Sequence, residues 1–235
     1  MFQRTDVIES SLKAAIAALA GVAFLWVLYH HFKGSAARGA RRANYLDQTK
    51  SLFEGGVKAV KPDGFPRISG TYQRHTFDLQ VVTDTLNIRK LPVLWLLVTL
   101  PEPMPVAGTF DVMMRPRGVE TFSKFMQLPV QIQPDPMFPH DCAIRADMAE
   151  AVPSRELMQR HVAMFQDDRV KELVISPKGL RIVWLAEEAH RGKYLLFRDA
   201  EMTLEPFQPH DLKPILDRLI ALRLDLMTTR PESAT

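Results

Sequence analysis

The 235-residue sequence contains a single cysteine, Cys142, and only 11 glycines. One cysteine cannot form an internal disulfide and leaves no cysteine cluster for zinc, which excludes a disulfide scaffold. The chain has no G-x-x-x-x-G-K-[ST], G-x-G-x-x-G, H-E-x-x-H, C-x-x-C or G-x-S-x-G motif. These absences weigh against the common NTPase, zincin, thioredoxin and hydrolase classes. We therefore predict no cofactor and no metal site.

The chain also has little excess of one charge over the other. Thirty Lys and Arg residues against 27 Asp and Glu residues give a net charge of only +3. No basic field covers the whole protein, and much of the positive excess lies in residues 33–43, so we predict no nucleic-acid partner. A hydrophobic content of 46% with 24% charged residues is that of an ordinary globular protein.

The most conspicuous feature is a long apolar run near the N-terminus. Residues 14–32 read AAIAALAGVAFLWVLYHHF and carry no formal charge when both histidines are neutral. As a helix they span roughly 28 Å, close to the hydrocarbon thickness of a bilayer. The run is apolar on every face, which argues against a soluble core helix, and Trp26 and Tyr29 lie where interfacial aromatic residues are expected. The run predicts a transmembrane helix over 14–32.

Two alternatives concern the ends of this run. The small residues 35–37 resemble a signal-peptidase site, but the leader carries Asp6 and Glu9 and the positive charges follow the run, which favours an uncleaved anchor. The positive-inside rule then predicts a short extracytoplasmic tail (1–13) and a cytoplasmic C-terminal domain. The cations that set this orientation, and that we expect to contact anionic lipid in the basic linker 33–43, are Lys33, Arg38, Arg41 and Arg42.

Within the apolar run, Ala17 and Gly21 form a small-xxx-small pair. Such a pair permits close approach of a second membrane helix, although alanine is common in these helices for other reasons. The pair is therefore a candidate packing site for a dimer or a membrane partner.

Residues 44–227 are long enough for one domain with its own core, and 228–235 are expected to be a loose tail. Hydrophobic spacing predicts a helix over 45–60 that ends or kinks at Gly55–Gly56, a second helix that opens at Ser154, and an amphipathic third helix over 211–227. Period-2 patterns and turn residues predict strands at 67–73, 76–84, 91–100, 108–114, 130–133, 143–148, 172–176, 180–186 and 193–202. The run 91–100 is too short to span a membrane as a helix and fits a central strand buried on both faces; a re-entrant membrane segment is the alternative.

Short turns between the strands indicate an α+β domain with a mainly antiparallel sheet and helices packed on one face. The order helix, strands, helix, strands also suggests a duplicated helix-plus-strands unit, although the two halves share no matching sequence.

The most reactive-looking residues are His140 and Cys142, separated by Asp141. A thiolate beside an imidazole is the pair that cysteine nucleophiles require, and His161 is a further candidate base. The plainer interpretation is a turn that leads into a strand with a small buried cysteine. The charged residues 167–172 fit a solvated junction better than an acidic metal site. Glu187 and Glu188 lie in a polar turn and point to opposite sides if extended, which argues against a paired-carboxylate site. Arg181, Arg191 and Arg198 are candidates for one basic sheet surface.

The leading hypothesis is a membrane-anchored, non-enzymatic interaction or assembly module. Its membrane contact would run through residues 14–42, and its cytoplasmic domain would bind a protein partner or another copy of itself. The rival hypothesis is a membrane-tethered enzyme that uses Cys142 with a nearby histidine.

Overall fold

The computed structural model of the chain describes residues 19–26, 29–30, 33, 36–84, 92–118, 120–189 and 202–228. The chain divides into two compact units, residues 1–42 and residues 43–235. In the first unit, 19–26 and 36–43 are helical, and the Trp26 ring lies 4.3 Å from that of His30.

Within the described residues, no helix has both the length and the apolar character needed to cross a membrane. Residues 14–18, 27–28 and 31–32 of the predicted membrane helix lie outside the described residues.

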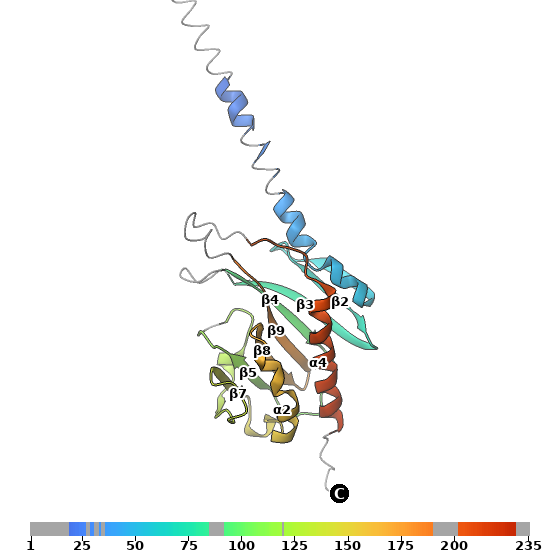
Figure 1. Cartoon of the computed structure of the whole chain (residues 1–235), viewed down its shortest axis with the longest axis vertical. Helices are drawn as coiled ribbons and strands as arrows, with labels where there is room; N and C mark the ends of the chain where they lie inside the picture. The colour runs from blue at the N-terminus through green and yellow to red at the C-terminus, as the bar shows by residue number, and fades with distance from the viewer. Residues whose placement is uncertain are drawn as a thin grey trace, which may run out of the picture. The chain divides into compact units, whose positions relative to one another are not determined.

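The second unit is built on one sheet in which every strand pair is antiparallel. Its described strands are β1 (Glu54–Val60), β2 (Pro66–Tyr72), β3 (His75–Asp84), β4 (Val93–Leu100), β5 (Phe110–Met114), β6 (Val130–Ile132), β7 (Cys142–Ala146), β8 (Val170–Ser176) and β9 (Gly179–Glu188). Their order across the sheet is β1-β2-β3-β4-β9-β8-β5-β7-β6. The predicted antiparallel α+β class is confirmed (Figure 1).

The β8–β9 hairpin lies between β4 and β5, so the chain must pass over its turn to continue. The connection after β4 passes close to this turn, as the hydrogen bond from the Met104 N–H to the Pro177 carbonyl over 3.1 Å shows. Gly179 has φ +141°, and a Cβ there would lie 2.2 Å from the Leu100 carbonyl oxygen. Only glycine fits this crossing. The two halves of the sequence thus contribute to a single sheet, and the duplication stays an interpretation.

Two α-helices, α2 (Arg155–His161) and α4 (Pro209–Thr228), lie on one face of this sheet (Figure 1). The short 3₁₀ segments are η1 (Asp47–Leu52), η2 (Phe125–Gln127), η3 (Ala149–Ala151) and η4 (Val162–Gln166). As predicted, the Ser154 hydroxyl caps α2 by accepting the Leu157 N–H over 3.3 Å. The predicted apolar stripe of α4 is also confirmed, since every member is buried: Leu212, Ile215, Leu216, Leu219, Leu222 and Leu226.

The predicted helix over 45–60 is wrong. Residues 47–52 form one 3₁₀ segment, and 54–60 form the edge strand β1. Gly55 adopts φ +63° at a bulge between Glu54 and Val57, a conformation that glycine favours and that interrupts a helix. The apolar spacing that indicated a helix arises because Tyr45 and Leu46 are buried ahead of the strand.

The prolines of the domain lie both beside a strand and inside a helix. Pro129 and Pro134 flank β6, which lies at the sheet edge where the proline-rich stretch predicted it. Pro214 was expected in the first turn of the last helix, but the helix begins at Pro209 and encloses it. Of the predicted strand 193–202, only Met202 lies within the described residues.

Candidate functional site

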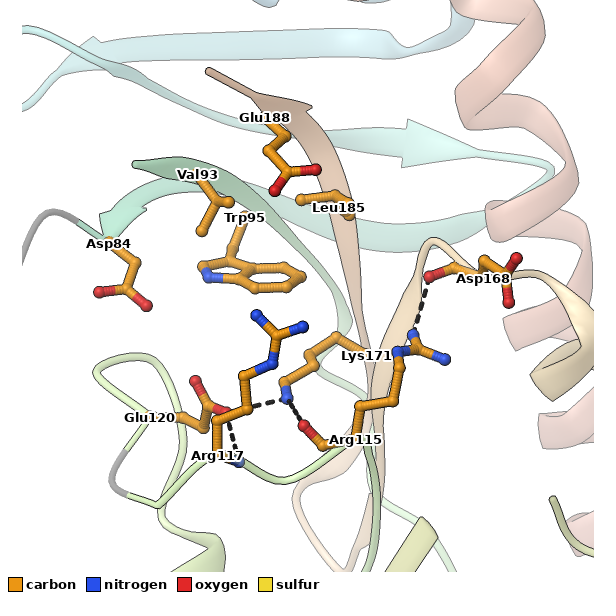
Figure 2. Close-up of a pocket in the computed structure, with 10 residues that line it drawn as sticks. All are labelled: Asp84, Val93, Trp95, Arg115, Arg117, Glu120, Asp168, Lys171, Leu185 and Glu188. Atoms are coloured by element: carbon orange, nitrogen blue, oxygen red, sulfur yellow. Dashed lines mark hydrogen bonds and ion pairs between the residues drawn. The ribbon is translucent and has the colours of Figure 1, made fainter. Parts of the chain in front are cut away.

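A pocket opens on the sheet face opposite α4, near the end of β3 and the start of β4 (Figure 2). Its cavity measures about 120 Å³. Its walls are Asp84, Val93, Trp95, Arg115, Arg117, Glu120, Asp168, Lys171, Leu185 and Glu188. This volume is below the range typical of small-molecule sites and suits a few polar atoms or a single side chain of a partner.

A buried ion pair forms the floor of the pocket. A bulge in β8 between Val170 and Glu172 turns Lys171 toward the segment that follows β5. The Lys171 Nζ lies 2.8 Å from Glu120 Oε1 and donates to the carbonyls of Met114 and Arg115 over 2.9 and 2.7 Å. Burial lowers the pKa of Lys171, while Glu120 acts in the opposite direction. All three ammonium protons have an acceptor, so this lysine does not serve as a free base. It holds in place the pocket wall that carries Arg115, Arg117 and Glu120.

The wall itself turns at Arg115, which adopts φ +47° although it carries a Cβ. Its guanidinium donates to the carbonyls of Asp168 and Val170 over 2.7 and 2.9 Å. These two bonds offset the cost of the left-handed backbone. Arg115 therefore fixes the course of the wall.

An aromatic ring and two buried, unpaired polar atoms lie on the side of the pocket formed by β3 and β4. Trp95 packs against Phe122 with 5.1 Å between ring centroids. Trp95 Nε1 and Asp84 Oδ1 are buried and have no hydrogen-bond partner among the described residues. The guanidinium of Arg117 points into the cavity below the indole ring (Figure 2). The pocket thus places a cation beside one apolar surface, and its walls include no serine, threonine or cysteine.

Beside the pocket, two carboxyl groups are buried against each other. Asp111 on β5 and Glu172 on β8 are 3% and 1% exposed. Burial, reinforced by Glu172, raises the pKa of Asp111 to about 9. Burial also raises the pKa of Glu172 to about 7, against the lowering effect of Ser123 and Arg181. Near neutral pH, Asp111 therefore keeps its proton and donates it to the Glu172 carboxylate, which also accepts the Ser123 hydroxyl.

The segment 120–128 covers this carboxyl pair. Phe122 and Phe125 pack with Leu97, Met113 and Val183 in a second, smaller apolar cluster. Arg145 on β7 donates to the Leu128 carbonyl over 2.7 Å and ties down the far end of the segment. The cover therefore rests on three polar tethers, which come from Lys171, Glu172 and Arg145.

The two edges of the sheet differ in their protection. β6 is three residues long and flanked by prolines, which discourages pairing with another strand. β1 is seven residues long, contains no proline and is mostly exposed, with Val57 69% and Val60 53% exposed. An exposed edge strand with apolar side chains is a template for strand addition.

The predicted catalytic candidates do not meet. His161 Nε2 lies 2.8 Å from Asp225 Oδ2, so this ring joins α2 to α4. Cys142 is half-buried at the start of β7, and His140 is exposed in the preceding turn. Burial, followed by the charge of Asp141, raises the pKa of the Cys142 thiol, the opposite of what a nucleophile needs. No contact between Cys142 and either histidine is found in this described part of the chain.

The predicted membrane-proximal residues lie in the first unit. Gly21 is in the helical stretch 19–26 with no neighbour within 4 Å of a Cβ position, and Ala17 lies outside the described residues. Lys33 is exposed, and its Nζ lies 5.9 Å from the Tyr29 ring centroid. Arg38, Arg41 and Arg42 are exposed along the helical stretch 36–43. Arg191 and Arg198 also lie outside the described residues, whereas Arg181 donates to Thr99 over 3.0 Å.

Sequence reasoning missed Asp111, Lys171 and Glu172 as buried groups. It assigned residues 167–172 to a solvated junction, but Lys171 and Glu172 are 3% and 1% exposed. A signal did exist, because both residues interrupt an otherwise apolar strand. No group of three or more His, Cys, Asp or Glu residues that could hold a metal ion occurs in the described ranges.

Comparison of the chain with protein-family models, with curated proteins and with solved structures finds no match in any of the three.

Proposed function

We propose that this protein is a membrane-anchored, non-enzymatic interaction module. Its domain, residues 44–227, binds an extended strand of a protein partner or of a second copy along β1. The observation that supports the proposal is the unequal protection of the sheet edges: β6 is short and flanked by prolines, while β1 is long and exposes two valines.

The anchor belongs to the same proposal. Residues 14–32 form the membrane helix, the tail 1–13 lies outside, and residues from Lys33 onward lie in the cytoplasm. In support, the exposed cations of 36–43 follow the apolar run directly. A helix-packing role for Ala17 and Gly21 and contact of the four cations with anionic headgroups complete this arrangement.

The first test is extraction of the full chain in mild detergent, followed by native mass determination. We expect a dimer or a complex with a co-purifying protein. A strictly monomeric chain without a partner contradicts the proposal.

The second test asks whether β1 carries the contact. We expect Val57→Lys with Val60→Lys to weaken the association at least tenfold, because lysines on an edge strand oppose strand addition. Leu224→Lys on α4 is the matched control, since Leu224 has the same 53% exposure as Val60. Equal effects of the edge variant and the control would assign the association to another surface.

A further inference from the structure

The buried carboxyl pair and the segment above it share one hydrogen bond, and this bond tethers the segment to the pair. The Ser123 hydroxyl donates to Glu172, and its oxygen accepts the Phe125 N–H over 3.0 Å. Ser123 thus joins the backbone of the cover 120–128 to the only charged group of the pair. The second apolar cluster lies directly beneath the cover.

The charged groups around the pair come from every element packed on it. Arg181 on β9 lies close enough to affect both carboxyl groups, and Lys171 on β8 acts on Glu172. Arg145 pairs with Asp111 in the β5–β7 register but directs its guanidinium to the Leu128 carbonyl. Glu120 pairs with Lys171, and Arg115 and Arg117 act on that lysine from the same wall. Arg181 is the cation left to balance the pair.

The direction of the coupling follows from burial. A closed cover keeps both carboxyl groups out of water, which favours their protonated forms. An open cover lets water reach them, so the pair binds protons less tightly in the open form. Loss of protons must then favour opening, by linkage. Lys171 titrates in the opposite sense, because burial lowers the pKa of its ammonium and its deprotonation favours the closed form.

We propose that residues 120–128 form a proton-gated cover, tethered by Ser123, which stays closed over the Asp111–Glu172 pair when the pair is protonated and opens as burial of the deprotonated pair becomes too costly. Opening exposes the apolar cluster around Leu97, Met113 and Val183. The inference does not depend on the proposed function of β1.

The test uses the full chain in detergent, labelled with 5-fluorotryptophan and followed by ¹⁹F NMR from pH 6 to pH 9. Trp95 reports on the cover because it packs against Phe122, and Trp184 is the internal control because it packs against Phe207 in the main core. The chain has a third tryptophan, Trp26, so replacement of each of the three by Phe in turn assigns the three resonances. We expect the Trp95 resonance to move with pH and that of Trp184 to stay fixed.

Two variants separate gating from other causes. Asp111→Asn with Glu172→Gln mimics the protonated pair, so we expect Trp95 to keep its pH 6 position at pH 9. Ser123→Ala leaves the carboxyl pair intact but removes the tether, so we expect the open position to be populated already at pH 6. Because the first variant removes buried charge, it is not expected to unfold the domain.

Each remaining outcome overturns the proposal. A Trp95 resonance that is flat from pH 6 to pH 9 shows that the pair does not gate the cover. A Ser123→Ala titration identical to that of the native chain shows that Trp95 senses charge through space and not opening. A pH response that survives in Asp111→Asn/Glu172→Gln assigns the response to another group, with Lys171 as the first candidate.

Discussion

The Lys171–Glu120 pair allows a sharp test of how the pocket wall is held. Their side chains are only 4% and 8% exposed, so each charge depends on the other. Removal of one partner from a buried pair typically costs 3–5 kcal/mol, whereas replacement of both by apolar residues is often neutral. Two carbonyls continue to accept from Lys171 after Glu120 is lost, which places the expected cost of Glu120→Leu near the lower limit, about 3 kcal/mol.

Thermal unfolding of the full chain in detergent, followed by far-UV circular dichroism, measures this cost. For a domain of this size about 1 kcal/mol corresponds to 2–4 °C, so we expect Glu120→Leu to lower Tm by roughly 6–12 °C. The double variant Glu120→Leu/Lys171→Met should recover most of that loss. It should still fall about 1 kcal/mol short, because the Met114 and Arg115 carbonyls lose their donor.

The control is Lys213→Met, which removes the exposed partner of Asp217 on α4. Those side chains are 57% and 40% exposed, and such pairs contribute about 0.5 kcal/mol or less. If Glu120→Leu changes Tm no more than this control, the pair is not structural. If the double variant is as unstable as the sum of the single variants, the wall depends on the charges themselves and the reasoning fails.

The remaining predictions concern the core, a helix cap, the carboxyl pair and the thiol. Leu219→Ala should cost about 3 kcal/mol because Leu219 is fully buried, and Leu224→Ala, at a half-exposed site, well under 1 kcal/mol; equal Tm shifts would contradict the packing of α4. Ser154→Ala should lower stability by about 1 kcal/mol through loss of the α2 cap, and Ser154→Asp should restore it. The folded-state pKa values of Asp111 and Glu172 are raised to about 9 and about 7, so the folded chain binds more protons than the unfolded chain. The contribution of the pair to stability therefore falls as pH rises from about 4 to 9. The free energies of unfolding from urea titrations at pH 6 and pH 9 should differ less in Asp111→Asn/Glu172→Gln than in the native chain. Alkylation of Cys142 at pH 7 should be at least several-fold slower in the folded chain than in urea, and a faster rate in the folded chain would revive a nucleophilic role.

The sequence predicts most of the strands for a physical reason that a single chain can show. β4 is apolar throughout because it lies fourth of the nine described strands, between β3 and β9, and is covered on both faces. α4 is recognisable because the six apolar residues of its predicted stripe recur at helical spacing and all six are buried. In both cases the local pattern and the tertiary environment agree.

They disagree at residues 45–60. The apolar residues there have helical spacing, but half of the segment pairs with β2 instead. Residues 54–60 form a strand because β2 (Pro66–Tyr72) has an unpaired edge with which they can pair. The local sequence of 45–60 does not show that edge. The sequence predicts that a helix ends or kinks at Gly55–Gly56, but these residues are part of the bulge that begins β1.

The candidate site was harder to foresee, because its burial comes from a segment without regular strand or α-helical structure. In β5, the core face carries Phe110, Val112 and Met114, so alternation alone places Asp111 on the outer face, toward water. Asp111 is nevertheless 3% exposed, because Phe122 and Phe125 fold the segment 120–128 back over that face.

In β8 even the alternation fails. The bulge between Val170 and Glu172 places Lys171 and Glu172 on the same side of the strand as the cover, so a period-2 pattern cannot assign them. What the sequence does retain is the composition of the cover, with two phenylalanines three residues apart around a serine. Without the cover, the polar groups of β5 and β8 would stay in water at no cost. Because the cover buries them, it has to supply a hydroxyl group as well as apolar side chains.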